Sequence, residues 1–75
     1  MAGELQIILG ANLRRHREAT GLSQEGFAEL KGFHRAYWGA LERGERNVSL
    51  RSLEHLAELV GASPVSLLVE PLVAE

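Results

Sequence analysis

Apolar residues recur every three or four positions through most of the chain, which is the spacing of one face of an α-helix. The first series includes Leu5, Ile8 and Leu9, and it predicts an amphipathic helix over residues 4–19. Gly21 follows soon after, and a glycine there is suited to the left-handed conformation that ends many helices.

Four further segments carry the same spacing and lie between helix start and stop signals. A serine or histidine in a capping position precedes three of them, at positions 23, 34 and 49, and Pro64 opens the last. The segments are residues 24–31, 35–43, 50–60 and 64–69. No run alternates with the two-residue period of a strand, so the sequence predicts an all-α fold of five helices in a single domain, residues 1–75.

The second and third segments have the physical pattern of a helix-turn-helix. Ala28 allows two helices to approach closely, and Gly32 can take the turn between them. Trp38 and Leu41 lie on the side of the later helix that packs on the core. We therefore expect this motif at about residues 24–43.

Three short motifs lie along the chain: GLSQ at 21–24, the run HRAYWGALERGERNVSL at 34–50, and SP followed by LL within 63–68. With these motifs, residues 8–68 resemble the Xre and lambda-repressor-like family of helix-turn-helix DNA-binding proteins. The middle run is similar to the controller proteins of restriction–modification systems. The resemblance implies a five-helix, lambda-repressor-like domain that binds a near-palindromic operator as a homodimer and regulates transcription. The sequence shows no sensor domain, so we expect DNA binding to be controlled by the concentration of the protein itself. Such control would suit autoregulation.

Charge is unevenly distributed along the chain. The net charge is −2, but all eight Lys and Arg residues lie between positions 14 and 51, where five Glu residues leave a net of +3. Asymmetry of this kind indicates a basic working face.

The composition argues against an enzyme and against a metal protein. There is no Asp and no Cys, and His16, His34 and His55 lack ligand spacing on one helix. The longest apolar stretch is far below the roughly 20 residues that cross a bilayer, and no export signal opens the chain. We therefore expect a cytoplasmic protein with no cofactor, no metal, no membrane contact and no evident small-molecule ligand.

On this resemblance, the start of the third helix lies in the major groove. Arg35 is the expected base reader, because a guanidinium can bond bidentately to guanine, and the alternatives are a phosphate contact or a solvated charge. Tyr37 is expected against a base or a phosphate, with a place in the core as the alternative. The expected base contacts are Arg35, Ala36, Tyr37 and Ala40.

Other residues are expected to hold the DNA backbone, since phosphate contacts fix the register of a protein on the duplex. Gln24 aligns with a family glutamine that binds phosphate. Arg46 is expected on phosphate or in the minor groove, with a solvated loop as the alternative. Asn47 has a structural alternative, a left-handed turn. The expected backbone contacts are Gln24, His34, Arg43, Arg46, Asn47, Ser49 and Ser52.

Three further assignments follow from the resemblance. Arg17 and Glu42 would form an internal ion pair between the first and third helices. Glu25 and Glu29 would meet the basic surface of a polymerase sigma subunit, with a solvated face as the alternative. A two-fold dimer would form through residues 64–73, although some of them could instead cap the core. The expected interface residues are Val65, Leu67, Leu68, Val69 and Leu72.

A second function stays open on the sequence. A helix-turn-helix chain can serve as a protein-interaction module, of the antitoxin or antiactivator type, that touches DNA only weakly. The negative net charge and the plain side chains of Ala36 and Ala40 are compatible with this alternative. Strong salt dependence of DNA binding would favour the regulator, because each phosphate that the protein neutralises releases counterions.

Overall fold

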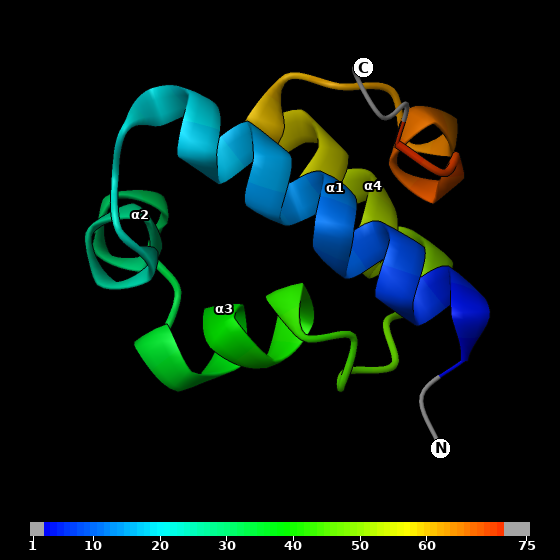
Figure 1. Ribbon diagram of the computed structural model, residues 1–75, viewed down its shortest axis with the longest axis horizontal. Coiled ribbons are helices and arrows are strands. Elements are labelled where there is room, and N and C mark those ends of the chain that lie inside the picture. The colour runs from blue at the N-terminus through cyan, green and yellow to red at the C-terminus, as the bar shows by residue number, and fades with distance from the viewer. Residues whose placement is uncertain (1–2, 72–75) are drawn as a thin grey trace.

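The computed structural model describes residues 3–71, and within that range it holds four α-helices, one short 3₁₀ turn and no strand (Figure 1). The helices are α1 (Glu4–Thr20), α2 (Gln24–Lys31), α3 (Arg35–Glu42) and α4 (Leu50–Val60), and the turn is η1 (Val65–Leu68). The predicted all-α fold is confirmed. The bounds of the four helices agree with the sequence pattern to within one residue.

The expected fifth helix over residues 64–69 is wrong, because the segment forms a single 3₁₀ turn. The amide of Leu67 donates to the carbonyl of Pro64 at 3.2 Å, a bond across three residues. The buried amide of Asn12 donates to the carbonyls of Leu67 and Val69, at 2.8 and 2.9 Å. A segment this short makes too few helical bonds to offset the cost of nucleating an α-helix. Its contacts with α1 therefore decide its shape.

The core is shared among all the helices. α1 packs against α3, α4 and η1, and α2 packs against α3. Figure 1 shows α1 in front of α4, with α2 at one end of the molecule and η1, in orange, at the other. The buried apolar side chains are Leu9, Leu13, Phe27, Ala28, Trp38, Leu41, Leu53, Leu56, Ala57 and Leu67. Since every element contributes, α3 is held in place by the whole domain.

One of the expected dimer residues lies in this core. Leu67 is fully buried, whereas Val65 and Val69 are 72% and 59% exposed and Leu68 is half-buried. The assignment of Leu67 to a dimer interface is therefore corrected, because η1 turns one side toward α1 and that side carries Leu67. Leu72 lies outside the described residues.

Capping residues and a turn at glycine determine where the two helices of the motif begin and end. Ser23 Oγ accepts a hydrogen bond from the amide of Gly26 at 3.0 Å, and His34 Nδ1 accepts one from the amide of Ala36 at 3.2 Å. Between the helices, Gly32 has a φ of +81°, in the left-handed region that glycine adopts at little cost. These local signals end α2 and begin α3 within a few residues.

Candidate nucleic-acid interface

α3 has one buried side and one exposed side. Trp38 is fully buried, with its ring centroid 4.8 Å from that of Phe27 and 5.6 Å from that of Phe33. Arg35 and Ala36 are exposed on the first turn. The core therefore anchors the back of α3 and leaves its N-terminal turn open to a partner.

A buried carboxylate ties α3 to both α1 and α2. The side chain of Glu42 is only 2% exposed, and Arg17 donates to it from Nε at 2.6 Å and from Nη2 at 3.0 Å. Gln24 Nε2 donates to Oε1 at 3.0 Å, and Trp38 Nε1 donates to Oε2 at 2.5 Å. The structure thus places Arg17 and Glu42 in an internal ion pair, away from the exposed side of α3.

The ionisation of this pair follows from its contacts. Burial by itself raises the pKa of Glu42, but the hydrogen bonds from Arg17, Gln24 and Trp38 together outweigh burial and lower that pKa. The hydrogen bond to Glu42 raises the pKa of Arg17, against the opposing effect of burial. Both groups are therefore charged at neutral pH, and the carboxylate can fix the C-terminal end of α3.

Gln24 and Arg43 lie over the middle of α3. A Cβ on Gly39 would be 3.3 Å from Gln24 Oε1 and 3.0 Å from Arg43 Nη1. Gly39, which is buried, leaves room for both side chains. Arg43 Nε also pairs with Glu45 at 3.1 Å, and one amide hydrogen of Gln24 is bonded to Glu42. The second amide hydrogen of Gln24 has no hydrogen-bond partner within residues 3–71.

Tyr37 connects α3 to the loop that follows it. Its ring centroid lies 5.7 Å from that of Phe33 in a stacked arrangement, and the guanidinium carbon of Arg46 lies 4.9 Å from the Tyr37 centroid. A cation–π contact of this kind contributes about 0.5–1 kcal/mol at an exposed site. Tyr37 is half-buried, so it combines a core contact with partial exposure. Arg46 is thereby held beside α3.

The loop between α3 and α4 reverses at Gly44. Gly44 has a φ of +74°, and within residues 3–71 only glycines have a positive φ. The structural alternative for Asn47, a left-handed turn, is therefore wrong, because glycine supplies the turn without a Cβ. Ser49 caps α4 by accepting a hydrogen bond from the amide of Ser52 at 3.0 Å, and their hydroxyls lie 3.1 Å apart.

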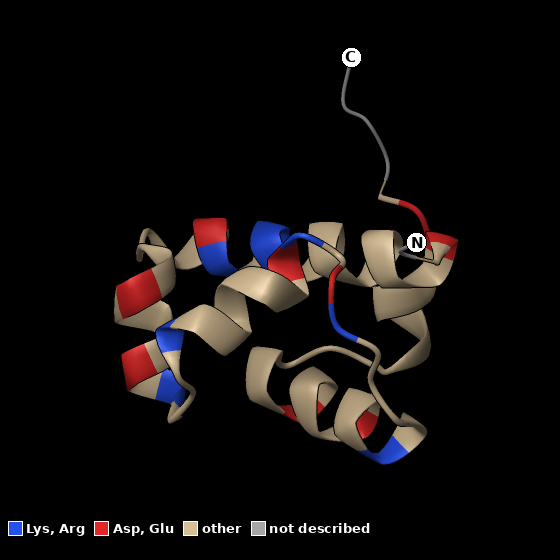
Figure 2. Ribbon diagram, turned by 90° about the horizontal axis from the view of Figure 1, so that it is seen from below, with Lys and Arg blue, Asp and Glu red and all other residues tan. Residues whose placement is uncertain are grey.

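The exposed side of α3 and the loop after it form what we call the recognition face. Its residues are Arg35, Ala36, Tyr37, Ala40, Arg43 and Arg46. Arg35 Nη1 lies 3.3 Å from Glu25 Oε2 on α2, and both side chains are largely exposed. Figure 2, seen from the side of α3, shows basic and acidic segments side by side along α2, α3 and the loop. Arg35 and Arg43 of the recognition face are thus paired with neighbouring carboxylates, Glu25 on α2 and Glu45 in the loop, so the surface around the face is mixed in charge.

A family model described as a helix-turn-helix domain matches residues 8–68, which take in all four helices apart from the first turn of α1. The chain belongs to the helix-turn-helix family. The motif expected from the residues at about 24–43 corresponds to α2 and α3 of this helix-turn-helix domain.

Relatives of this helix-turn-helix chain include control proteins of restriction–modification systems. Control protein C.SmaI of Serratia marcescens is 45% identical over 65 residues, which cover 87% of this chain and 77% of the relative. The crystal structure of the restriction–modification controller protein C.AhdI from Aeromonas hydrophila matches with a TM-score of 0.67 and 45% identity, over 83% of this chain and 94% of that one. The resemblance to controller proteins is confirmed.

A third relative was solved with nucleic acid. The controller protein C.Esp1396I, a tetramer in complex with its natural 35 base-pair operator, matches this helix-turn-helix chain with a TM-score of 0.69 and 26% identity. The match covers 87% of this chain and 86% of that one. These relatives are controllers, which favours a binding protein over an enzyme.

Two residues of α1 that hold this helix-turn-helix domain together were not singled out by the sequence pattern. Asn12 is 4% exposed and fastens η1, as described above. Gly10 is buried where α1 meets α3. The signal for Asn12 was present, since a polar residue stands in register with Leu9 and Leu13 on the apolar side of the helix. Its partners, 55 and 57 residues away, could not be read from the pattern.

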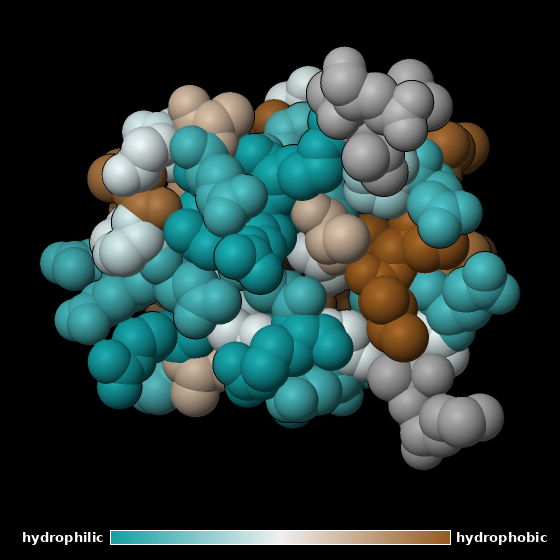
Figure 3. Space-filling model, in the orientation of Figure 1, coloured by the Kyte–Doolittle hydropathy of each residue, from teal (hydrophilic) through white to brown (hydrophobic). Residues whose placement is uncertain are grey.

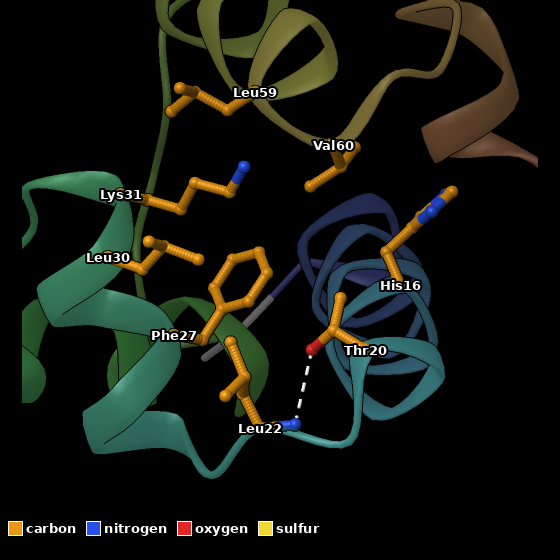
Figure 4. Close-up of a pocket in the computed structure, with 8 residues that line it drawn as sticks. All are labelled: His16, Thr20, Leu22, Phe27, Leu30, Lys31, Leu59 and Val60. Carbon is orange, nitrogen blue, oxygen red and sulfur yellow. Dashed lines mark hydrogen bonds between the residues drawn. The ribbon is translucent and has the colours of Figure 1, made fainter.

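A small pocket lies between the C-terminal ends of α1, α2 and α4 (Figure 4). Its volume is about 150 Å³, and clefts that hold small ligands are typically about 300–1,000 Å³. The ammonium of Lys31 lies 5.7 Å from the Phe27 ring centroid, and Thr20 Oγ1 accepts from the Leu22 amide at 3.2 Å. Lys31 and Thr20 are thus engaged with the domain itself. The lining residues are His16, Thr20, Leu22, Phe27, Leu30, Lys31, Leu59 and Val60.

Two other kinds of site were sought in the part of the chain that the structure describes. Across residues 3–71, no three His, Asp or Glu side chains gather into a possible metal site. No helix in the same range is long and apolar enough to cross a bilayer.

Proposed function

We propose that this protein is a sequence-specific DNA-binding transcriptional regulator that acts as a homodimer on a near-palindromic operator and controls its own synthesis. The observation that carries the proposal is the arrangement of α3, whose back is buried through Trp38 while Arg35 and Ala36 stand exposed on its first turn. A recognition helix reads the major groove with its N-terminal residues. The controller protein C.Esp1396I, which shares this fold, was solved in complex with its operator, and this supports DNA binding by the present chain.

Each residue of the recognition face has a chemical role in this proposal. Arg35 bonds to guanine O6 and N7, a contact that contributes about 1–3 kcal/mol of discrimination. The methyl groups of Ala36 and Ala40 can favour a thymine methyl. Tyr37 contacts a base or a phosphate through the exposed part of its side chain, while Phe33 supports its ring.

The DNA backbone is held on both sides of α3. The N-terminal ends of α2 and α4 offer free amides to phosphates, since helix N-termini carry partial positive charge. Arg46, stacked on Tyr37, is placed to reach phosphate or the minor groove. The residues proposed to contact the backbone are Gln24, His34, Arg43, Arg46, Asn47, Ser49 and Ser52.

The dimer is proposed to form through the exposed apolar residues around η1. Val65 is 72% exposed and Leu50 is 79% exposed. Leu5 and Leu68 line a groove of about 180 Å³ that also includes Leu50. In Figure 3 hydrophobic residues gather over the N-terminal part of α1, the helix that carries Leu5. Contiguous exposed apolar surface on a small protein marks an association site. Two copies could then place their α3 helices about 34 Å apart, one turn of DNA.

Contact with a polymerase sigma subunit is a further part of the proposal. Glu25 and Glu29 are exposed and lie one turn apart on α2. Among the ion pairs of residues 3–71, Glu25 takes part in one and Glu29 in none. Their carboxylates are therefore accessible to a basic surface.

Selection of bound DNA from a random pool, at two salt concentrations, tests the proposal. We expect a two-fold symmetric motif with half-sites about one helical turn apart, and affinity that falls steeply with salt. Arg35→Ala should relax the preference at one symmetric base position. Arg14→Ala is the matched control, since Arg14 is an exposed arginine on α1 paired with Glu18, and it should leave the motif unchanged.

Recovery of no motif would overturn the proposal. It would favour the alternative function, a protein-interaction module of the antitoxin or antiactivator type. The mixed charge of the surface around the recognition face, where Glu25 lies beside Arg35, is the feature that such a module would use.

A further inference from the structure

The ion pair between Arg35 and Glu25 joins the two helices of the motif at the point where DNA would enter. Glu25 stands in the first turn of α2 and Arg35 is the first residue of α3. Arg35 Nη1 lies 3.3 Å from Glu25 Oε2, with the side chains 69% and 66% exposed. An ion pair this open to solvent contributes little to folding. Its position suggests a role in binding instead.

Resting on the proposed function, we propose that Glu25 is a specificity-determining residue. It holds Arg35 in a position to bond to a base, and it opposes contacts between Arg35 and the phosphates of unselected DNA. The carboxylate bonds only Nη1 of the guanidinium. Nε and Nη2 have no hydrogen-bond partner within residues 3–71. The edge of the guanidinium that carries these two nitrogens is therefore left for a bidentate contact.

The same carboxylate opposes unspecific binding. A guanidinium that turned to a phosphate would leave Glu25 unpaired beside a polyanion, and this like-charge contact becomes more costly where the interface excludes water. A guanine contact lets Arg35 stay beside Glu25. The acid therefore weakens binding to random DNA more than binding to the operator.

The expected size follows from the exposure of the pair. One exposed ion pair changes an equilibrium by about two- to fivefold. A dimer carries two such pairs, so the ratio of operator affinity to random-DNA affinity should change by about four- to 25-fold. The folding of the domain should be unaffected, which separates this role from a structural one.

The test compares dissociation constants of the full chain for the selected operator and for a scrambled duplex of equal length, at one salt concentration and without polymerase. Glu25→Gln should lower the ratio of the two affinities by about fourfold or more while the melting temperature stays unchanged. Glu29→Gln removes the same charge one turn along α2 and should leave the ratio unchanged.

An Arg35→Ala background identifies the cause. There, Glu25→Gln should no longer alter the ratio, because the residue it positions is absent. A ratio that is insensitive to Glu25→Gln, or that changes equally in the Arg35→Ala background, would overturn the inference while the proposed function stands. A wild-type protein that binds operator and scrambled DNA equally would overturn both.

Discussion

Gly10→Ala places a methyl group where α1 and α3 come closest. A Cβ at position 10 would lie 2.5 Å from the carbonyl oxygens of both Leu41 and Glu42, and 2.9 Å from the carbonyl carbon of Glu42. Carbon–oxygen contacts between packed helices are normally about 3.3–3.6 Å. The obstructing atoms belong to the backbone, so no side-chain rotation can relieve the contact. α3 must move by most of an ångström relative to α1.

Two opposing effects set the change in stability. Alanine is the better helix former by about 1 kcal/mol in a helix interior. Overpacking a core costs about 1–3 kcal/mol, sometimes more, and a clash with rigid backbone on two sides belongs at the upper end of that range. We expect the free energy of unfolding to fall by about 2 kcal/mol. In a domain of this size that corresponds to a melting temperature lower by roughly 8–16 °C.

Thermal melts at one protein concentration measure this change, with Gly26→Ala as the control. A Cβ on Gly26 in α2 would meet only the Ser23 side chain at 3.3 Å and that of Leu22 at 3.9 Å or beyond. We expect Gly26→Ala to raise the melting temperature slightly. The same substitution, glycine to alanine, should therefore stabilise the protein in α2 and destabilise it in α1. A Gly10→Ala protein as stable as wild type would refute the reasoning that α1 and α3 are held at this distance.

Three further variants test separate contacts. Glu42→Gln should lower the free energy of unfolding by about 3 kcal/mol at pH 7, because Arg17 stays buried without its charge partner. The pKa of Glu42 is lowered in the folded state, so this stabilisation is complete above the unfolded value of about 4.3 and is lost as the pH falls through the folded value. The free energies of unfolding of wild type and Glu42→Gln, measured by urea titration, should therefore converge in acid. A difference between them that stays constant with pH would contradict the argument. Arg46→Ala should weaken binding to all sequences alike and reduce the salt slope by about one unit, and an unaltered slope would remove Arg46 from the DNA backbone. Val65→Glu should give monomers in sedimentation while Leu30→Glu, an equally exposed site on α2, keeps the dimer; dimers in both would place the interface elsewhere.

Local signals in the sequence were sufficient for the helices and for the family. Ser23 and Ser49 cap α2 and α4, and Gly32 makes the turn of the motif, because capping and left-handed turns depend on a few adjacent residues. The core side of α3 followed from spacing alone, since Trp38 stands in register with Leu41. The base and backbone contacts assigned by resemblance stay predictions until DNA binding is measured.

The tertiary structure alone decided the contacts between residues that are distant in sequence. Asn12 makes η1 a 3₁₀ turn against α1, and this overrode the helix signal of Ser63 and Pro64. Packing also brought Glu25 to Arg35. The hydrophobic periodicity of the sequence does not encode these contacts, because each depends on the angle and distance at which two folded segments pack against each other. The sequence by itself therefore determined the four α-helices and which side of each faces inward. Packing decided the form of the last segment and how the polar groups pair around the recognition face.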